Sequence, residues 1–285
     1  MSSIAYITDS KMLEHHRLHN HETMNFWRVT ANTNFSDFTV NDLVFFLSKD
    51  KEQMSQKEKG IVGFGRVKKI NVSSINKMWK DYKQDNGYNT IEEFKAAIKA
   101  VSKERRLPRK ISSFYLENVT FFQPIYLSEF DLKISKNIES YIYIQQDEVV
   151  KKLLKLAKEN NDIWTSENNE TKIEHEEKLY SIFMAHKKIG NIEYDEKKES
   201  KIFKYLQKEK ENTKYEFIKN CKTELYRLNE DELEILMYLE KENEIRNLIG
   251  QAKLFKNELS IIDSKINVTF KTTNKDIKVE YLMNN

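Results

Sequence analysis

Apolar residues follow two different spacings along this chain, and the change comes near residue 145. Before it, short runs rich in β-branched and aromatic residues alternate with polar turns, which is typical of strands. The segment 91–101 instead has apolar residues at helical spacing after Thr90, a residue type that caps helices. The pattern predicts an α+β first domain over residues 1–145, with one or two helices inserted among its strands. The predicted strands are 26–29, 43–47, 61–67, 119–122 and 141–144.

After residue 145 the spacing is mainly helical. A long helix is predicted over 196–227, followed by another over 230–245. The tail differs, because apolar and polar residues alternate over 266–270 and again over 277–281, which predicts a β-hairpin. Residues 146–285 are therefore expected to form a mainly α-helical domain that ends in a β-hairpin.

Two neighbouring strand signals are the most informative part of the first half. A polar turn at Asn41 and Asp42 leads into the apolar run 43–46, and a charged loop separates this run from 59–67, which carries three glycines. Glycine normally weakens a strand, so it tends to mark a bulge, a bend in a barrel or a ligand close to the backbone. The pair predicts a small β-barrel with a binding cleft.

Charge is distributed unevenly, although the net charge of the 285 residues is only +3. Residues 51–110 hold 16 Lys and Arg against 7 Asp and Glu. A concentrated basic region beside a neutral remainder is typical of a protein with an anionic partner. The solvated faces of Lys-rich proteins have the same composition, so charge alone leaves both interpretations open.

Composition favours a soluble protein of the cytoplasm. Cys221 is the single cysteine and cannot form an internal disulfide, which fits a reducing compartment. The N-terminus lacks the charged start and apolar run of a signal peptide, and no apolar stretch approaches membrane-spanning length. We therefore expect a cytoplasmic location and no membrane partner.

Three motifs of the first half occur in a characteristic order: Trp27 in the first strand signal, the turn and strand 41–46, and the glycine strand 60–67. In this order they resemble the PUA-like superfamily, nearest its EVE branch, with YTH, ASCH and SRA domains as relatives. The resemblance covers about residues 22–145. It departs from the family at Asn41, where glycine is usual, and asparagine also accepts left-handed turn geometry.

The resemblance implies a domain that binds nucleic acid, with DNA favoured over RNA, and holds one extruded, modified base in an aromatic pocket. It further implies a place in systems that restrict modified foreign DNA, as in phage defence. Unstacking a base costs free energy, which stacking on aromatic rings and hydrogen bonds to the base edge recover. The base-pocket candidates are Trp27, Thr30, Asn32, Phe46, Ser48, Trp79, Tyr82 and Tyr88.

Each pocket candidate also has a purely structural interpretation. Trp27 and Phe46 are strand residues, and a strand aromatic is commonly part of a core. The aromatic side chains of 79–88 could form a pocket wall or pin the inserted helix. Thr30 and Asn32 follow the first strand, where they could bind a base edge or form a turn. The sequence leaves these alternatives open.

Basic residues before and after the inserted helix are the candidates for contacts with phosphate. Arginine binds phosphate oxygens in a bidentate manner, and such contacts position a nucleic acid without reading its sequence. A solvated loop is the alternative. The phosphate-binding candidates are Arg66, Lys68, Lys69, Lys103, Arg105, Arg106, Arg109 and Lys110.

Four histidines, His15, His16, His19 and His21, lie within seven residues. His15 and His19 are one helical turn apart, a spacing that lets two imidazoles share a metal ion. No cysteine accompanies them, and no third ligand is evident apart from a neighbouring glutamate. We therefore interpret the cluster as adventitious and expect no metal and no cofactor.

No catalytic motif is recognisable, and neither are the signature residues of the ASCH enzymes that hydrolyse acetylcytidine, so the sequence does not favour an enzyme. One alternative is a fused sensor and nuclease, because Asp276, Lys278 and Glu280 alternate onto one face of the predicted hairpin and could hold a metal ion. Another is an interaction module, in which the second half forms a homodimer or recruits a partner effector protein.

Overall fold

The computed structural model describes residues 3–31, 35, 38–53, 58–102, 105–126, 140–160, 166–190, 192–229, 232–260, 262 and 265–273, with the side chains of 49–53, 58 and 166–168 left out. The chain divides into two compact units, Met1–Glu174 and His175–Asn285. Within the described residues, none of the helices is long and apolar enough to cross a lipid bilayer.

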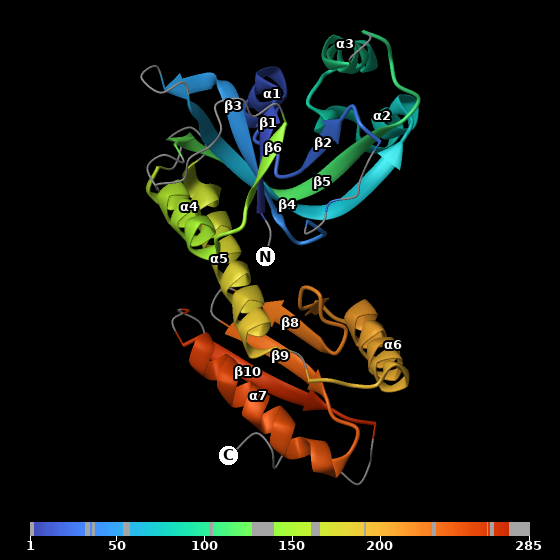
Figure 1. Ribbon diagram of the computed structural model, residues 1–285, viewed down its shortest axis with the longest axis vertical. Coiled ribbons are helices and arrows are strands. Elements are labelled where there is room, and N and C mark those ends of the chain that lie inside the picture. The colour runs from blue at the N-terminus through green and yellow to red at the C-terminus, as the bar shows by residue number, and fades with distance from the viewer. Residues whose placement is uncertain are drawn as a thin grey trace. The chain divides into compact units, whose positions relative to one another are not determined.

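The first unit is built on one mixed, strongly curved sheet of six strands (Figure 1). Its strand order is β2-β5-β4-β3-β1-β6, in which β1 and β3 run parallel and the other neighbours antiparallel. Closure of this sheet into a barrel stays a prediction. The strands are β1 Ser3–Thr8, β2 Met24–Arg28, β3 Leu43–Gln53, β4 Glu58–Ser73, β5 Ile111–Ile125 and β6 Tyr141–Ile144.

The helices of the first unit begin at recognisable caps. The predicted helix over 91–101 is confirmed as α3, and Thr90 forms a capping box with Glu93 at its start. Asp9 caps α1 by accepting a hydrogen bond from the amide of Met12. The helices are α1 Ser10–Leu18, α2 Ile75–Tyr82, the 3₁₀ turn η1 Lys83–Asn86, α3 Ile91–Val101 and α4 Asp147–Glu159, and α5 Ser166–Ile189 runs into the second unit.

Strand β2 separates two apolar layers of the first unit, because neighbouring strand residues point to opposite faces. On one face, the ring of Phe26 packs 6.1 Å from the rings of both Phe46 and Phe114. On the other face, Trp27 meets Phe94 of α3 edge to face at 5.7 Å. The inserted helices therefore cover the outer face of β2.

The second unit is also α+β. Its four-stranded sheet has the order β10-β9-β8-β7, in which β9 and β10 are parallel and the other pairs antiparallel. Helix α7 lies between β9 and β10 in the chain, so these three elements form a β-α-β crossover. The remaining elements are α6 Glu196–Asn212, β7 Glu216–Phe217, β8 Glu224–Leu228, β9 Glu232–Tyr238, η4 Glu242–Glu244, α7 Ile245–Glu258 and β10 Lys265–Lys271.

Residues 146–285 hold helices α4 to α7, but they also form a four-stranded sheet that the sequence did not predict. The helix predicted over 196–227 ends at Asn212, and the region predicted as a helix over 230–245 contains β9. The continuous apolar run in β9 fits a buried strand as well as a helix, and periodicity alone does not separate the two. The strand over 266–270 is confirmed as part of β10, but its partner is β9, and the second hairpin arm lies outside the described residues.

Candidate functional site

Trp27, the first of the predicted pocket residues, is a core residue. Its side chain is only 8% exposed, and its indole Nε1 donates a hydrogen bond to the backbone carbonyl of Asn86 at 3.2 Å. The ring also packs near Tyr88, which is itself buried. Trp27 therefore joins β2 to the inserted segment, which agrees with the interpretation of this residue as part of a core.

The other predicted pocket residues lie in several different places. Phe46 is fully buried against Phe26, and Ser48 is buried in β3 opposite Thr8. Thr30 is exposed, and its carbonyl accepts a hydrogen bond from the amide of Ser112. Asn32 lies outside the described residues.

The aromatic side chains of 79–88 hold the inserted helices in place. Trp79 is half-buried against Phe94, and Tyr82 stacks on Tyr115 of β5 with ring centroids 5.1 Å apart. Burial is the main cause that raises the pKa of both Tyr82 and Tyr88, so their phenols stay protonated. Trp27, Trp79 and Tyr88 thus meet around Phe94, whereas Phe46 and Ser48 lie on β3. The role of these candidates in base binding stays a prediction.

A different group of side chains has the composition of a stacking site. It consists of Tyr6, Arg28, Phe35, Tyr141 and Tyr143, and we call it the aromatic–arginine cluster. The Cζ atom of Arg28 lies 4.6 Å from the ring centroid of Phe35 and 5.5 Å from that of Tyr6. Its Nε donates a hydrogen bond to the hydroxyl of Tyr6 at 3.1 Å. The guanidinium is therefore held between aromatic faces.

The tyrosines of the cluster come from two paired strands. Tyr6 of β1 lies directly opposite Tyr141 of β6, and their rings stack at 5.5 Å with an interplanar angle of 14°. Tyr143 follows two residues later on the same face and meets Tyr141 edge to face at 5.6 Å. Burial, together with Tyr143, raises the pKa of Tyr141, so its hydroxyl stays protonated at neutral pH.

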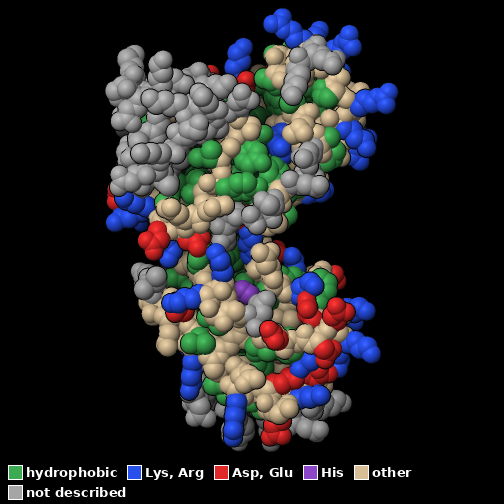
Figure 2. All heavy atoms as spheres, viewed as in Figure 1, with side chains coloured by type: hydrophobic (Ala, Val, Ile, Leu, Met, Phe, Trp, Pro, Cys, Tyr) green, Lys and Arg blue, Asp and Glu red, His purple; other side chains and the backbone are tan. Residues whose placement is uncertain are grey.

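The four rings of the cluster are half-buried, whereas Arg28 is 8% exposed. Figure 2 shows hydrophobic side chains gathered on one face of the first unit, over the area where β5 and β6 lie in Figure 1. Partly exposed rings that already stack on one another offer a surface to a further planar group.

An exposed basic segment directly precedes the part of β5 that pairs with Arg28. It consists of Arg105, Arg106, Arg109 and Lys110, and β5 begins at the next residue, Ile111. Ser112, two residues after Lys110, is the cross-strand neighbour of Arg28. Short chain connections therefore place this positive charge near the aromatic–arginine cluster.

The remaining phosphate candidates differ in exposure. Lys68 and Lys69 are exposed on β4, and Lys68 forms an ion pair with Glu117 at 3.2 Å. Arg66 is only 2% exposed and donates a hydrogen bond to the carbonyl of Asn41, so it does not present its guanidinium at the surface. Lys103, Asp276, Lys278 and Glu280 lie outside the described residues.

Sequence reasoning missed the aromatic–arginine cluster. The alternation of Tyr141 and Tyr143 on a predicted strand was a usable signal, because it places both rings on one face. Nothing in the sequence pairs this strand with Tyr6, which is 135 residues away from Tyr141 in the chain. The pairing of β1 with β6 is what creates the site.

Comparison with known proteins gives limited information. No protein-family profile matches the sequence, and no curated protein matches it. Solved structures similar to this chain include the ASCH protein of Zymomonas mobilis and two single-residue variants of it, at 11–12% sequence identity. They cover 54% of this chain and 94–97% of their own, with TM-scores of 0.38–0.39. Similarity at this level assigns neither an activity nor a branch such as EVE.

Proposed function

We propose that the first unit binds nucleic acid by stacking an unpaired base on the aromatic–arginine cluster. The observation that carries the proposal is the arrangement of Arg28, which is held between the rings of Phe35 and Tyr6 beside two further half-exposed tyrosines. Every base has a flat π face, and aromatic and arginine side chains bind such faces without requiring a particular sequence.

The basic segment supplies the second half of the interaction. Arg105, Arg109 and Lys110 are exposed, and they lie within seven residues of Ser112, the strand partner of Arg28. Lysine and arginine contacts with phosphate contribute affinity and register, whereas contacts with the base contribute selectivity. Proteins that bind an extruded base likewise use separate side chains for the base and for the backbone.

The motif resemblance to PUA-like domains supports the same class of ligand. It adds the finer proposal that the base is modified, that DNA is preferred over RNA, and that the protein acts in restriction of foreign DNA. A binding panel at fixed salt tests these points separately. It compares single-stranded DNA, duplex DNA and RNA, each with cytosine, methylcytosine or hydroxymethylcytosine at one position, by fluorescence anisotropy.

Substitutions in the cluster test the site itself. Tyr143→Leu keeps an apolar side chain on β6 but removes one stacking ring, and Arg28→Lys keeps the charge but removes the flat guanidinium. Tyr143→Leu is expected to weaken binding by ~5- to 150-fold, because one stacked base contributes ~1–3 kcal/mol. Arg28→Lys should weaken binding by releasing the rings that the buried guanidinium holds in place. Tyr115→Leu is the matched control, since Tyr115 is a half-buried strand tyrosine that stacks on Tyr82 instead.

The affinities of these variants distinguish between the possible binding sites. Equal affinity of the wild type and the Tyr143→Leu variant for every ligand would remove the aromatic–arginine cluster as the site. Loss of binding in Tyr115→Leu, with Tyr143→Leu unaffected, would place the site on the originally predicted aromatic group near Tyr82. Substitution of Arg109 and Lys110 by alanine should lower the affinity for all ligands alike and flatten its dependence on salt.

A further inference from the structure

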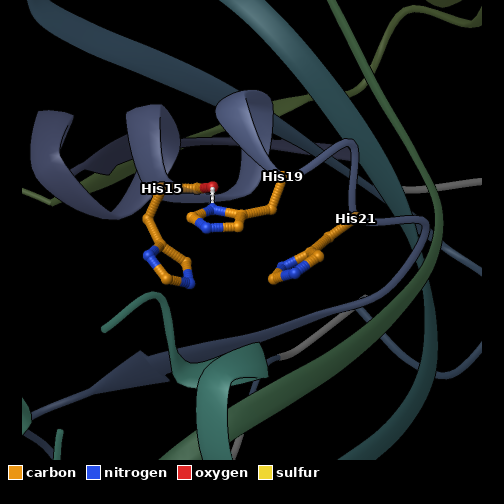
Figure 3. Close-up of side chains that lie close together, drawn as sticks. All are labelled: His15, His19 and His21. Carbon is orange, nitrogen blue, oxygen red and sulfur yellow. Dashed lines mark hydrogen bonds between the residues drawn. The ribbon is translucent and has the colours of Figure 1, made fainter. Parts of the chain in front are cut away.

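The histidines at the end of α1 form a compact group of imidazoles. One ring nitrogen from each of His15, His19 and His21 lies within 4.8 Å of the corresponding nitrogens of the other two. Figure 3 shows the three rings turned toward a shared space beside the end of the helix. In a four-coordinate site the ligand nitrogens stand ~3.3 Å apart, because each metal–nitrogen bond is about 2 Å long, so small rotations of these rings would let them share one ion.

The backbone conformation at the end of α1 positions these rings. His15 and His19 are one helical turn apart and so project from the same face of α1. The helix ends at Leu18, and Asn20 has a left-handed conformation with φ of 49°, which turns the chain back. The amide of His21 then donates a hydrogen bond to the carbonyl of His16, and this contact holds His21 beside the helix.

Hydrogen bonds leave nitrogen lone pairs available in the group. His19 Nδ1 donates to the carbonyl oxygen of His15 at 2.8 Å, so its proton is on Nδ1 and its Nε2 keeps a lone pair. His21 Nδ1 lies 3.0 Å from His16 Nδ1, which leaves His21 Nε2 outside that bond. His15 is 9% exposed, and its buried Nε2 has no hydrogen-bond partner among the described residues. A buried nitrogen without a partner costs free energy, which a bound ion would offset.

The surroundings of His15 and His21 favour the neutral imidazole, the form that binds a metal ion. Burial, followed by the neighbouring His19 and His21, lowers the pKa of His15. Burial also lowers the pKa of His21, although the carboxylate of Asp85 acts in the opposite direction. Glu93 has the same opposing effect on His15. These two carboxylates supply negative charge near a site where a cation would lie.

We propose that His15, His19 and His21 bind one divalent transition-metal ion of the Zn²⁺ and Cu²⁺ class. Three neutral imidazoles form a nitrogen-rich ligand set, which favours these ions over Mg²⁺ and Ca²⁺. Three protein ligands leave a fourth position for water or an exogenous ligand. The carbonyl that accepts from His19 Nδ1 orients that ring in the way outer-shell groups orient metal ligands in proteins.

Metal binding has a structural consequence for the first unit. His21 lies three residues before β2, the strand that ends at Arg28, and His15 lies within α1. An ion shared by these residues would fasten the end of α1 to the start of β2. The ion would also stabilise the folded protein by mass action, because the unfolded chain does not hold the three rings together.

The test uses the full chain without a histidine tag, titrated with Zn²⁺ by calorimetry and with Co²⁺ by visible absorption. We expect one ion per chain, a Co²⁺ spectrum of a four-coordinate site, and a higher Tm with Zn²⁺. His19→Asn keeps a donor for the carbonyl of His15 but removes Nε2, and it should weaken binding at least ~10-fold. His21→Asn should have the same effect and serves if the first variant is poorly folded.

His175→Asn is the matched control, because it removes one histidine from α5, outside this group. Its affinity for Zn²⁺ should equal that of the wild type. The proposal is overturned if the wild type binds no ion at stoichiometric concentration. It is also overturned if folded His19→Asn and His21→Asn bind Zn²⁺ as tightly as the wild type.

Discussion

At the scale of single residues, the second unit contains a buried charged pair beside its cysteine. The Nε2 atom of His186 lies 3.3 Å from a carboxylate oxygen of Glu224, and the two side chains are 7% and 4% exposed. Gln251 donates to the other carboxylate oxygen at 2.6 Å. Buried pairs of this kind depend on complete hydrogen bonding, because each ion loses its hydration.

The proton on His186 leads to a prediction about pH. Burial by itself lowers the pKa of His186, but the neighbouring Cys221 and Glu224 side chains raise it overall to about 9. The folded state therefore holds this proton more tightly than the unfolded state, whose pKa is about 6.5. The resulting stabilisation is complete below pH ~6.5 and disappears as the pH rises through 9.

Urea unfolding at pH 6 and at pH 9.5 measures this effect. The free energy of unfolding of the second unit should fall by ~2–3 kcal/mol between the two values. His186→Gln should remove most of the fall, whereas His175→Gln, on the same helix, should retain it. An equal fall in both variants would show that another group carries the pH dependence.

At the scale of elements, the glycines of β4 let this strand approach its neighbour β5 closely. The sequence predicted a bulge, a bend in a barrel or a ligand close to the backbone in this strand, and of these the irregular register is present. The register with β5 shifts between Ile61 and Gly63, and a Cβ atom at Gly63 would lie 2.5 Å from the carbonyl oxygen of Thr120. The close neighbour at this position is the backbone of β5.

Alanine at Gly63 should therefore destabilise the first unit. The backbone of β5 would have to move, and overpacking of this kind costs ~1–3 kcal/mol. Gly250→Ala is the control: an added Cβ would meet nothing within 4 Å in α7, and alanine should stabilise that helix by ~0.5–1 kcal/mol. Tryptophan fluorescence during urea unfolding reads out the first effect, since all tryptophans precede residue 175. Unchanged unfolding of Gly63→Ala would contradict the close approach.

At the scale of the whole molecule, each unit has apolar core residues of its own among the described residues. The core of the first unit includes Phe94 and Ile98 under the inserted helices. In the second unit, Ile202 and Leu206 of α6 pack against the sheet. Because each unit has its own apolar core, we propose that the two unfold separately.

Hydrogen exchange followed by mass spectrometry tests this separation. Leu236→Ala removes a side chain that is 1% exposed in β9 and should cost ~2–5 kcal/mol. In this variant, the protection of backbone amides should fall across the second unit and stay unchanged in β3, β4 and β5. Ile98→Ala should produce the reverse pattern. Loss of protection throughout the chain in either variant would indicate one cooperative unit.

The candidate site shows how far reasoning from sequence can reach. The strand signals, the α3 helix with its Thr90 cap and the unusual glycine strand were all predictable, because each depends on residues close together in the chain. Trp27 was correctly placed in a strand but favoured for the pocket, and the structure puts it in the core. Its neighbour Arg28 faces the other way and lies in the aromatic–arginine cluster.

Local order was sufficient to predict several strands and one helix in the first half of this protein, because turns, caps and alternation act over a few residues. It did not predict β1 or α1. Only the tertiary structure shows which elements and side chains become neighbours. It places β1 beside β6, β9 beside β10, and three histidines around one space at the end of α1. These contacts depend on which strands become neighbours and on how far a chain turns after a helix. No short sequence window contains that information, so the sites of this protein became visible only in three dimensions.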